Sequence, residues 1–203
     1  GIGAWLLLRQ DDEEGPDATL PTSIQGVLAA RVDGLAPRER SVLRHAAVEG
    51  RTFHAGAIAA LLGEARRGDV EISLVALARK GLVRAAGSAL AGEDAFAFDH
   101  ALLRDAAYMG IPKRLGATLH EGVASWLDAR PDAPPESVGH HLERALALRA
   151  ELGDELGEAG ARLAAQAAAR FETAARAALA RGDARAAGGL LERAVGVLAP
   201  GDP

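Results

Sequence analysis

The stretch Phe96-Ala97-Phe98-Asp99-His100-Ala101-Leu102-Leu103-Arg104-Asp105-Ala106-Ala107-Tyr108 decides how this chain folds. Phe96 and Phe98 alternate as in a short strand with one buried face, and the leucines and alanines of 102–107 then follow at helical spacing. His100 lies at the junction of these two patterns. Because only 3% of the residues are aromatic, this concentration of large side chains predicts a core that fixes a strand against a helix.

Three helices and two short strands are predicted around this stretch. Apolar residues recur at helical spacing over 37–50, 55–62 and 69–80. The apolar positions expected in the third helix are Ile72, Leu74, Val75 and Leu77. Arg51-Thr52-Phe53 is expected to turn the chain, and strands at 82–84 and 96–98 are expected to flank a glycine-containing loop. Three helices followed by a two-stranded wing is the order of a winged helix-turn-helix.

The residues before this unit predict a linker and one more helix. Residues 1–9 have the pattern of the last turns of a helix, and 11–16 form an acidic, Gly-Pro-ended linker. Ser23 is a plausible N-cap for a helix that ends before Gly34. The apolar face expected for that helix consists of Ile24, Val27, Leu28 and Val32.

Only helices are predicted after residue 112, over 115–129, 136–152, 155–180 and 184–198. The last pair fits the tetratricopeptide pattern of about 34 residues. The positions that fit it are Phe171, Ala175, Gly182, Ala187, Leu191 and Ala194. An alanine-rich pair of helices without a true repeat remains the alternative. The fold class expected is therefore mainly α, with a winged helix-turn-helix followed by a tetratricopeptide-like helical region.

Two stretches resemble one protein family. Residues 96–108 resemble the histidine-bearing end of the winged-helix domain in STAND-type signalling ATPases, where the phrase F-x-[FM]-x-H-x-L-L-x-D follows the wing. Plant resistance-protein relatives carry it as the M-H-D motif, and this chain has Ala101 in place of that Asp. Residues 21–35 resemble the helix P-x-[ST]-I-Q-x-L-L-x-A-R-[LV]-D-x-L that enters the winged-helix domain from the ATPase lid. The resemblance covers most of 21–148.

The resemblance implies a division of the chain and a role for it. Residues 1–34 would enter from an ATPase core, 35–113 would form the winged helix, and 114–203 the helical sensor. The chain would be a catalytically silent, regulatory segment that transmits nucleotide or inducer state to an output domain, as in bacterial regulators linked to class III nucleotidyl cyclases or in LuxR-type regulators. Its partners would be the ATPase core of the same chain and a protein or small-molecule inducer on the helical repeat.

The same resemblance makes His100 the candidate site residue. In STAND proteins the histidine of this motif faces the phosphates of bound ADP, and an imidazole donor suits a phosphate oxygen. ATP or ADP with Mg²⁺ would belong to the parent protein, and no cofactor is expected in this segment alone. The competing interpretation is structural, with His100 capping the helix or bonding across the wing as a partly buried side chain.

Other chemistry has little support in the sequence. No phosphate-binding loop, dinucleotide glycine motif or nucleophile elbow is present. The adjacent pair His140 and His141 should diverge on a helix, so solvated histidines are expected there and no metal site. A DNA-binding winged helix with a helical dimerisation or ligand domain is the alternative function. It is disfavoured by the net charge of −5 and by the acidic residues Asp69 and Glu71, with Ser73, in the third helix.

The remaining expectations concern location. The absence of cysteine is compatible with a reducing cytoplasm. The apolar run at 2–8 is too short to span a bilayer and lacks the features of a signal peptide, so a cytoplasmic location without a membrane contact is expected. The chain begins at Gly1 without an initiator methionine, from which we expect a piece of a longer protein.

Overall fold

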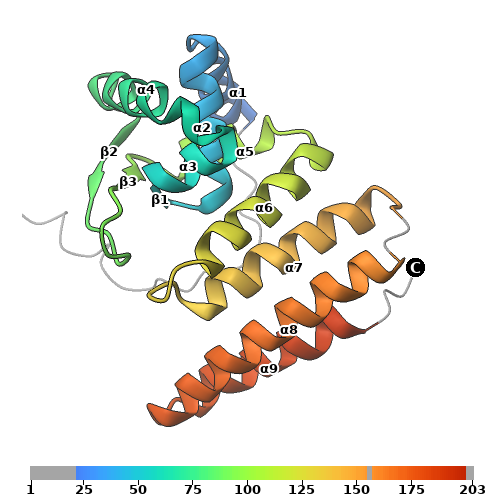
Figure 1. The fold of residues 1–203 in the computed structure, drawn as a ribbon. Coiled ribbons are helices and arrows are strands. Elements are labelled where there is room, and N and C mark those ends of the chain that lie inside the picture. Colours follow the sequence, from blue (N-terminus) through green and yellow to red (C-terminus); the bar gives the residue numbers. More distant parts are fainter. Residues whose placement is uncertain (1–21, 155–156, 200–203) are drawn as a thin grey trace, which may run out of the picture.

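The computed structural model describes residues 22–154 and 157–199, and this part of the chain is mainly α-helical (Figure 1). It contains nine α-helices, a single 3-10 turn and a three-stranded antiparallel sheet. The elements are α1 (Thr22–Asp33), α2 (Pro37–Glu49), β1 (Thr52–His54), α3 (Ala55–Leu62), η1 (Glu64–Arg66), α4 (Arg67–Arg79), β2 (Val83–Ala86), β3 (Ala95–Phe98), α5 (Ala101–Met109), α6 (Lys113–Asp128), α7 (Pro135–Glu151), α8 (Gly157–Ala180) and α9 (Ala184–Leu198). The helix and linker expected over 1–16 lie outside the described residues.

The sheet has one strand more than expected. Its order is β1-β3-β2, and β1 pairs with β3 so that Phe53 lies opposite Phe96. The prediction of a turn at 51–53 was therefore wrong. A strand of three residues is too short to show an alternating pattern, but its β-branched Thr52 and its fully buried Phe53 suit a pleated sheet with one covered face.

The core beneath the sheet contains the large side chains that were predicted to fix a strand against a helix. Phe98 and Leu103 are buried, and Phe96 and Tyr108 are partly buried and pack against the same cluster. The rings of Phe53 and Phe98 meet edge to face with their centroids 5.3 Å apart, a favourable geometry for two aromatic quadrupoles. The change from strand to helix at residue 100 thus brings β3 and α5 onto one core.

The orientation of α4 differs from the prediction. Val70, Ser73, Leu74 and Leu77 are its buried residues, and they follow the spacing of a single helical face. Ile72 and Val75 lie off that face, and their exposed fractions are 71% and 51%. Val27, which was expected on the apolar face of α1, is also exposed, and so is Leu191 of α9, which fits the tetratricopeptide pattern. The helix α1 also begins at Thr22, so Ser23 is inside the helix and is not its cap.

The helices α6, α7, α8 and α9 lie side by side as successive layers (Figure 1). Two glycines permit close contacts of these helices. A Cβ on Gly139 of α7 would lie 2.8 Å from the ring of the buried Phe171 on α8. A Cβ on Gly122 of α6 would overlap with Leu61 of α3. Because Gly139 has no side chain, α7 and α8 can pack closely. Because Gly122 has none, α6 can pack closely against the sheet-containing part of the molecule.

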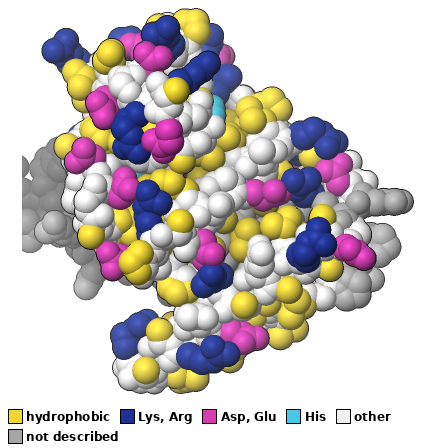
Figure 2. Space-filling view, viewed as in Figure 1, with side chains coloured by type: hydrophobic (Ala, Val, Ile, Leu, Met, Phe, Trp, Pro, Cys, Tyr) yellow, Lys and Arg dark blue, Asp and Glu magenta, His cyan; other side chains and the backbone are white. Residues whose placement is uncertain are grey.

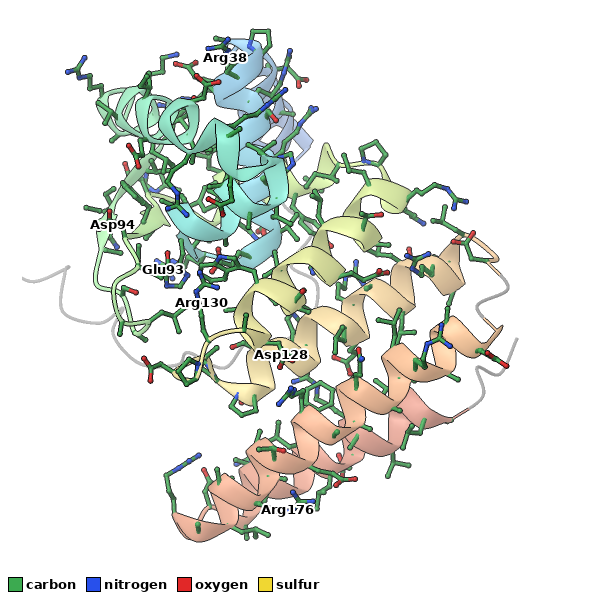
Figure 3. All side chains as sticks on the ribbon, in the orientation of Figure 1. Arg38, Glu93, Asp94, Asp128, Arg130 and Arg176 are labelled. Carbon is green, nitrogen blue, oxygen red and sulfur yellow. The ribbon has the colours of Figure 1, made fainter. Side chains whose placement is uncertain are left out.

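The loop between β2 and β3 packs against α6. It thereby connects the sheet-containing part of the molecule, α1–α5 with the three strands, to the helical part, α6–α9. Its Leu90 is buried in the same cluster as Leu127 of α6. Its Glu93 accepts a hydrogen bond of 2.6 Å from Arg130, just beyond the end of α6, and Figure 3 shows these two side chains turned toward each other. The Arg130 guanidinium also stacks on Trp126, with its Cζ 3.5 Å from the ring centroid. The loop is therefore held against α6 by an apolar contact and by a partly buried ion pair.

No helix within the described residues has both the length and the apolar character needed to cross a bilayer.

Candidate functional site

His100 is placed by its backbone at the start of α5. Its extended backbone, with φ −134° and ψ 134°, makes it the N-cap residue, and its carbonyl accepts hydrogen bonds from the amides of Leu103 and Arg104. The imidazole makes no capping bond, and within the described residues no hydrogen bond of its ring is found. The side chain is exposed. His100 is therefore open to a group on another domain or molecule.

Two further histidines are buried together where α5, α6 and α7 meet. His120 and His141 are only 2% and 3% exposed, and their Nδ1 atoms lie 2.8 Å apart. On the other side of His120, its Nε2 lies 2.8 Å from the Tyr108 hydroxyl, which accepts a bond of 3.4 Å from Nε of Arg144. These contacts form one continuous chain of hydrogen bonds.

Two proton orders satisfy these contacts. An arginine can only donate, so the Tyr108 hydroxyl accepts from Arg144, and it can in addition either donate to Nε2 of His120 or accept from it. In the first order His120 donates from Nδ1 to Nδ1 of His141, and in the second order His141 donates to His120. No partner of Nε2 of His141 is found in the described part of the chain.

Burial keeps both rings neutral. Loss of hydration, with the neighbouring His141 as the second cause, lowers the pKa of His120 to about 2. Loss of hydration, with His140 as the second cause, lowers the pKa of His141 to about 3. Both shifts have the direction expected when a cationic ring would be removed from water. The direct bond between the two imidazoles requires that the accepting Nδ1 carries no proton, so at least the accepting ring is neutral.

Glu49 and His54 form a separate pair. The Glu49 carboxylate accepts from Nδ1 of His54 at 2.5 Å and from the His54 backbone amide at 2.9 Å. A carboxylate only accepts, so Nδ1 of His54 carries a proton. Nε2 of His54 is buried without a hydrogen-bond partner among the described residues. A buried polar atom that lacks a partner destabilises the fold.

The pair Glu49 and His54 and the buried His141 border one cavity of about 400 Å³. His54 lines it from β1, Leu90 from the β2–β3 loop, His140 and His141 from α7, and Arg193 from α9. The cavity thus lies where the sheet-containing part meets the helical part. Its volume is within the usual range for small-molecule sites.

A metal site is not part of this arrangement. No group of three or more His, Asp or Glu side chains in the described ranges 22–154 and 157–199 is arranged to hold a metal ion. Although several histidines line the cavity, Glu49 and Arg193 already occupy one nitrogen each of His54 and His140.

The cavity histidines were not singled out by the sequence. The ring centroids of His140 and His141 are 5.5 Å apart and both side chains line the cavity, so the two do not diverge as expected. His141 is also buried and not solvated, which corrects the expectation for this residue. A signal was present, because His141 shares the helical spacing of Val138, Leu142 and Ala145, all of them buried. His120 likewise lies at the spacing of the buried positions of α6. The pairing of Glu49 with His54 depends on the turn between α2 and β1 and has no such signal.

Comparisons of the chain with protein-family models, with curated proteins and with solved structures found no match.

Proposed function

We propose that this chain is a regulatory, non-catalytic segment of a STAND-type signalling ATPase. The observation that carries the proposal is the order of elements α2, β1, α3, α4, β2, β3, in which the three strands form one antiparallel sheet and His100 lies two residues after the end of β3. A winged helix-turn-helix has this order. The motif stretch at 96–108 falls at the end of this unit, where the winged helix of STAND proteins carries its histidine.

In this role His100 is the contact to nucleotide. Its ring is exposed and makes no hydrogen bond to the described residues around it, so its two nitrogens are available to a phosphate on another domain. The parent protein would supply ATP or ADP with Mg²⁺. The nucleotide state would reach the helical part through α5 and α6, which Tyr108 and His120 connect by a hydrogen bond.

The helical part is the proposed sensor. The helices α8 and α9 are joined by Gly182 with φ +82°, a conformation that favours glycine. Phe171, Ala175, Ala187 and Ala194 are buried in their packing. This hairpin supports a tetratricopeptide-like unit, and a protein or small-molecule inducer is its proposed partner.

The surface of α4 gives little support to the DNA-binding alternative. In a DNA-binding winged helix the third helix presents amide or basic groups to base edges. The exposed basic residues of α4 are at its two ends, Arg67 and Arg79, and the exposed positions between them include Glu71, Ile72 and Val75. Ser73 is turned inward to bond the Asp69 carbonyl. Figure 2 shows basic and acidic side chains interspersed on the visible face, without a continuous basic patch. Such a surface binds phosphate weakly.

The experiment that separates these functions uses the chain itself and its gene. We expect neither ATP nor ADP to bind the isolated chain, and a duplex selection at physiological salt to recover no defined motif. The coding sequence on the N-terminal side should contain a phosphate-binding loop of the form G-x-x-x-x-G-K-[ST]. A defined DNA motif bound with nanomolar affinity would favour the alternative function and contradict the proposal.

A further inference from the structure

Helix α9 carries apolar residues on two different sides. One side packs on α8 through the buried Ala187, Leu190 and Ala194. The second side is exposed apart from one half-buried glycine, and its members are Ala184, Gly188, Leu191, Val195 and Leu198. These five residues are called the α9 stripe. They recur at alternating intervals of four and three residues, which is the spacing of the seam between two paired helices.

The α9 stripe differs from the scattered apolar residues of an ordinary surface. Single exposed aliphatic side chains are normal, but Leu191, Val195 and Leu198 follow one line of the helix and are 44%, 68% and 54% exposed. Among the successive helical layers α9 is the last, and it packs mainly on α8 (Figure 1). The stripe is therefore open to another helix.

Gly188 has no evident purpose in the packing of the single chain. Glycine in the middle of a helix is less favourable than alanine, and a Cβ at this position would meet no atom within 4 Å. Contacts within the described residues thus give no reason for a glycine. A large side chain from another molecule would give one, because the missing Cβ leaves room for it.

The sizes of the side chains along the stripe indicate how a second copy can pack on it. The small Ala184 and Gly188 occupy the N-terminal half, and the large residues occupy the C-terminal half. In an antiparallel pair, Leu191 lies over Gly188 of the second copy and Val195 lies over Ala184. In a parallel pair, glycine would face glycine and leave a void, which close-packed interfaces avoid. Leu198 lies at the end of the stripe, beyond these layers.

Two charged residues beside the stripe favour the same orientation. Arg185 and Glu192 are exposed, lie seven residues apart and therefore follow one edge of the helix. The ion pairs of α9 in the described part of the chain belong to Arg193. No residue of opposite charge is three or four positions from Arg185 or Glu192. In the antiparallel register, Arg185 of each copy lies beside Glu192 of the other, which gives two ion pairs by symmetry.

We propose that the α9 stripe docks onto the same stripe of a second copy of this chain in antiparallel orientation. The pairing buries aliphatic side chains that the single chain leaves in water, and it gives Arg185 and Glu192 partners of opposite charge. A surface of about four helical turns is small for a protein interface, so the dimer forms weakly and reversibly. The inference does not rest on the proposed function, because it uses only the surface of the helical part.

Sedimentation velocity of the chain tests this docking. Between about 5 and about 500 µM, where weak interfaces form, we expect a concentration-dependent shift from monomer to dimer. Val195→Glu places a charge in the seam at an exposed residue and should weaken the dimer at least tenfold. Ile72→Glu, at an exposed apolar residue of α4, is the matched control and should dimerise as the wild type does. Circular dichroism verifies that both variants fold.

Charge exchange tests the orientation. Arg185→Glu and Glu192→Arg each place like charges together in an antiparallel homodimer and should weaken it severalfold. An equimolar mixture of these two variants should dimerise as the wild type does, because every edge contact then joins opposite charges. The proposal is overturned if the wild type stays monomeric over the whole range, if Val195→Glu weakens the dimer no more than Ile72→Glu does, or if the mixture associates no better than either variant alone.

Discussion

The buried pair His120 and His141 predicts a steep loss of stability between pH 7 and pH 5. In the folded protein the pKa values of these rings are about 2 and about 3, whereas an unfolded histidine has a pKa of about 6.5. Below pH 6.5 the unfolded chain therefore binds protons that the folded chain does not. Stability is fully present above this pH and is lost as the pH falls toward the folded values.

The size of the effect follows from the linkage relation. Each histidine that stays neutral in the folded state and titrates in the unfolded state costs about 2 kcal/mol between pH 7 and pH 5. The pair therefore costs about 4 kcal/mol, a large part of the 5–15 kcal/mol typical of a domain. Burial also lowers the pKa of His45, which acts in the same direction. The lowered carboxyl pKa of Glu39, which bonds Lys80, affects stability only below about pH 4.5.

Urea unfolding followed by circular dichroism at pH 7.0, 6.0, 5.5 and 5.0 measures this loss. His141→Gln removes one of the two titrating rings and should reduce the fall to about 2 kcal/mol, whatever its stability at pH 7. His100→Gln, at an exposed ring, should retain the full fall. A wild-type free energy of unfolding that changes by less than about 1 kcal/mol, or an equal fall in His141→Gln, would refute the account of the buried pair.

Two further predictions concern packing, and both are measured as free energies of unfolding in urea at pH 7. Phe98→Ala should cost about 3–5 kcal/mol because Phe98 is fully buried, whereas Ile72→Ala, at a residue 71% exposed, should change stability by less than about 0.5 kcal/mol; similar losses at the two positions would contradict the assigned core. Gly139→Ala should cost about 1–3 kcal/mol, since its new Cβ would lie 2.8 Å from the Phe171 ring. Gly188→Ala, with no atom within 4 Å of the new Cβ, should be neutral or stabilising, and an equal response of both glycine variants would show that the α7–α8 contact is looser than described.

The helices were largely predictable from the sequence because apolar residues recur in them at helical spacing. The predicted ranges 55–62 and 184–198 match α3 and α9 at both ends. The side that a helix buries was less predictable. In α4, Ile72 and Val75 are as apolar as Leu74 and Leu77, and only contact with α2 and α3 determines which pair is covered.

The candidate sites also differ in how far the sequence could predict them. His100 could be singled out because it lies where two local patterns meet. The cavity could not, because Glu49 and His54 come from the consecutive elements α2 and β1, whereas His141 and Arg193 come from α7 and α9, which are distant from them in sequence. A periodic pattern can indicate that His141 faces a core, but the partner on each ring nitrogen is a property of the packed structure.

Nucleotide retention by the full-length parent tests the central claim most directly. The wild-type protein and His100→Ala would be purified in parallel, and bound ADP would be quantified after denaturation. Loss of a hydrogen bond between the imidazole and a phosphate is worth about 1.5–3 kcal/mol, so we expect ADP affinity to fall roughly ten- to a hundredfold and basal output to rise. His140→Ala, at the other histidine with a mostly exposed side chain, should retain ADP as the wild type does. Equal ADP occupancy and equal basal output in His100→Ala and wild type would contradict the proposed regulatory role of His100.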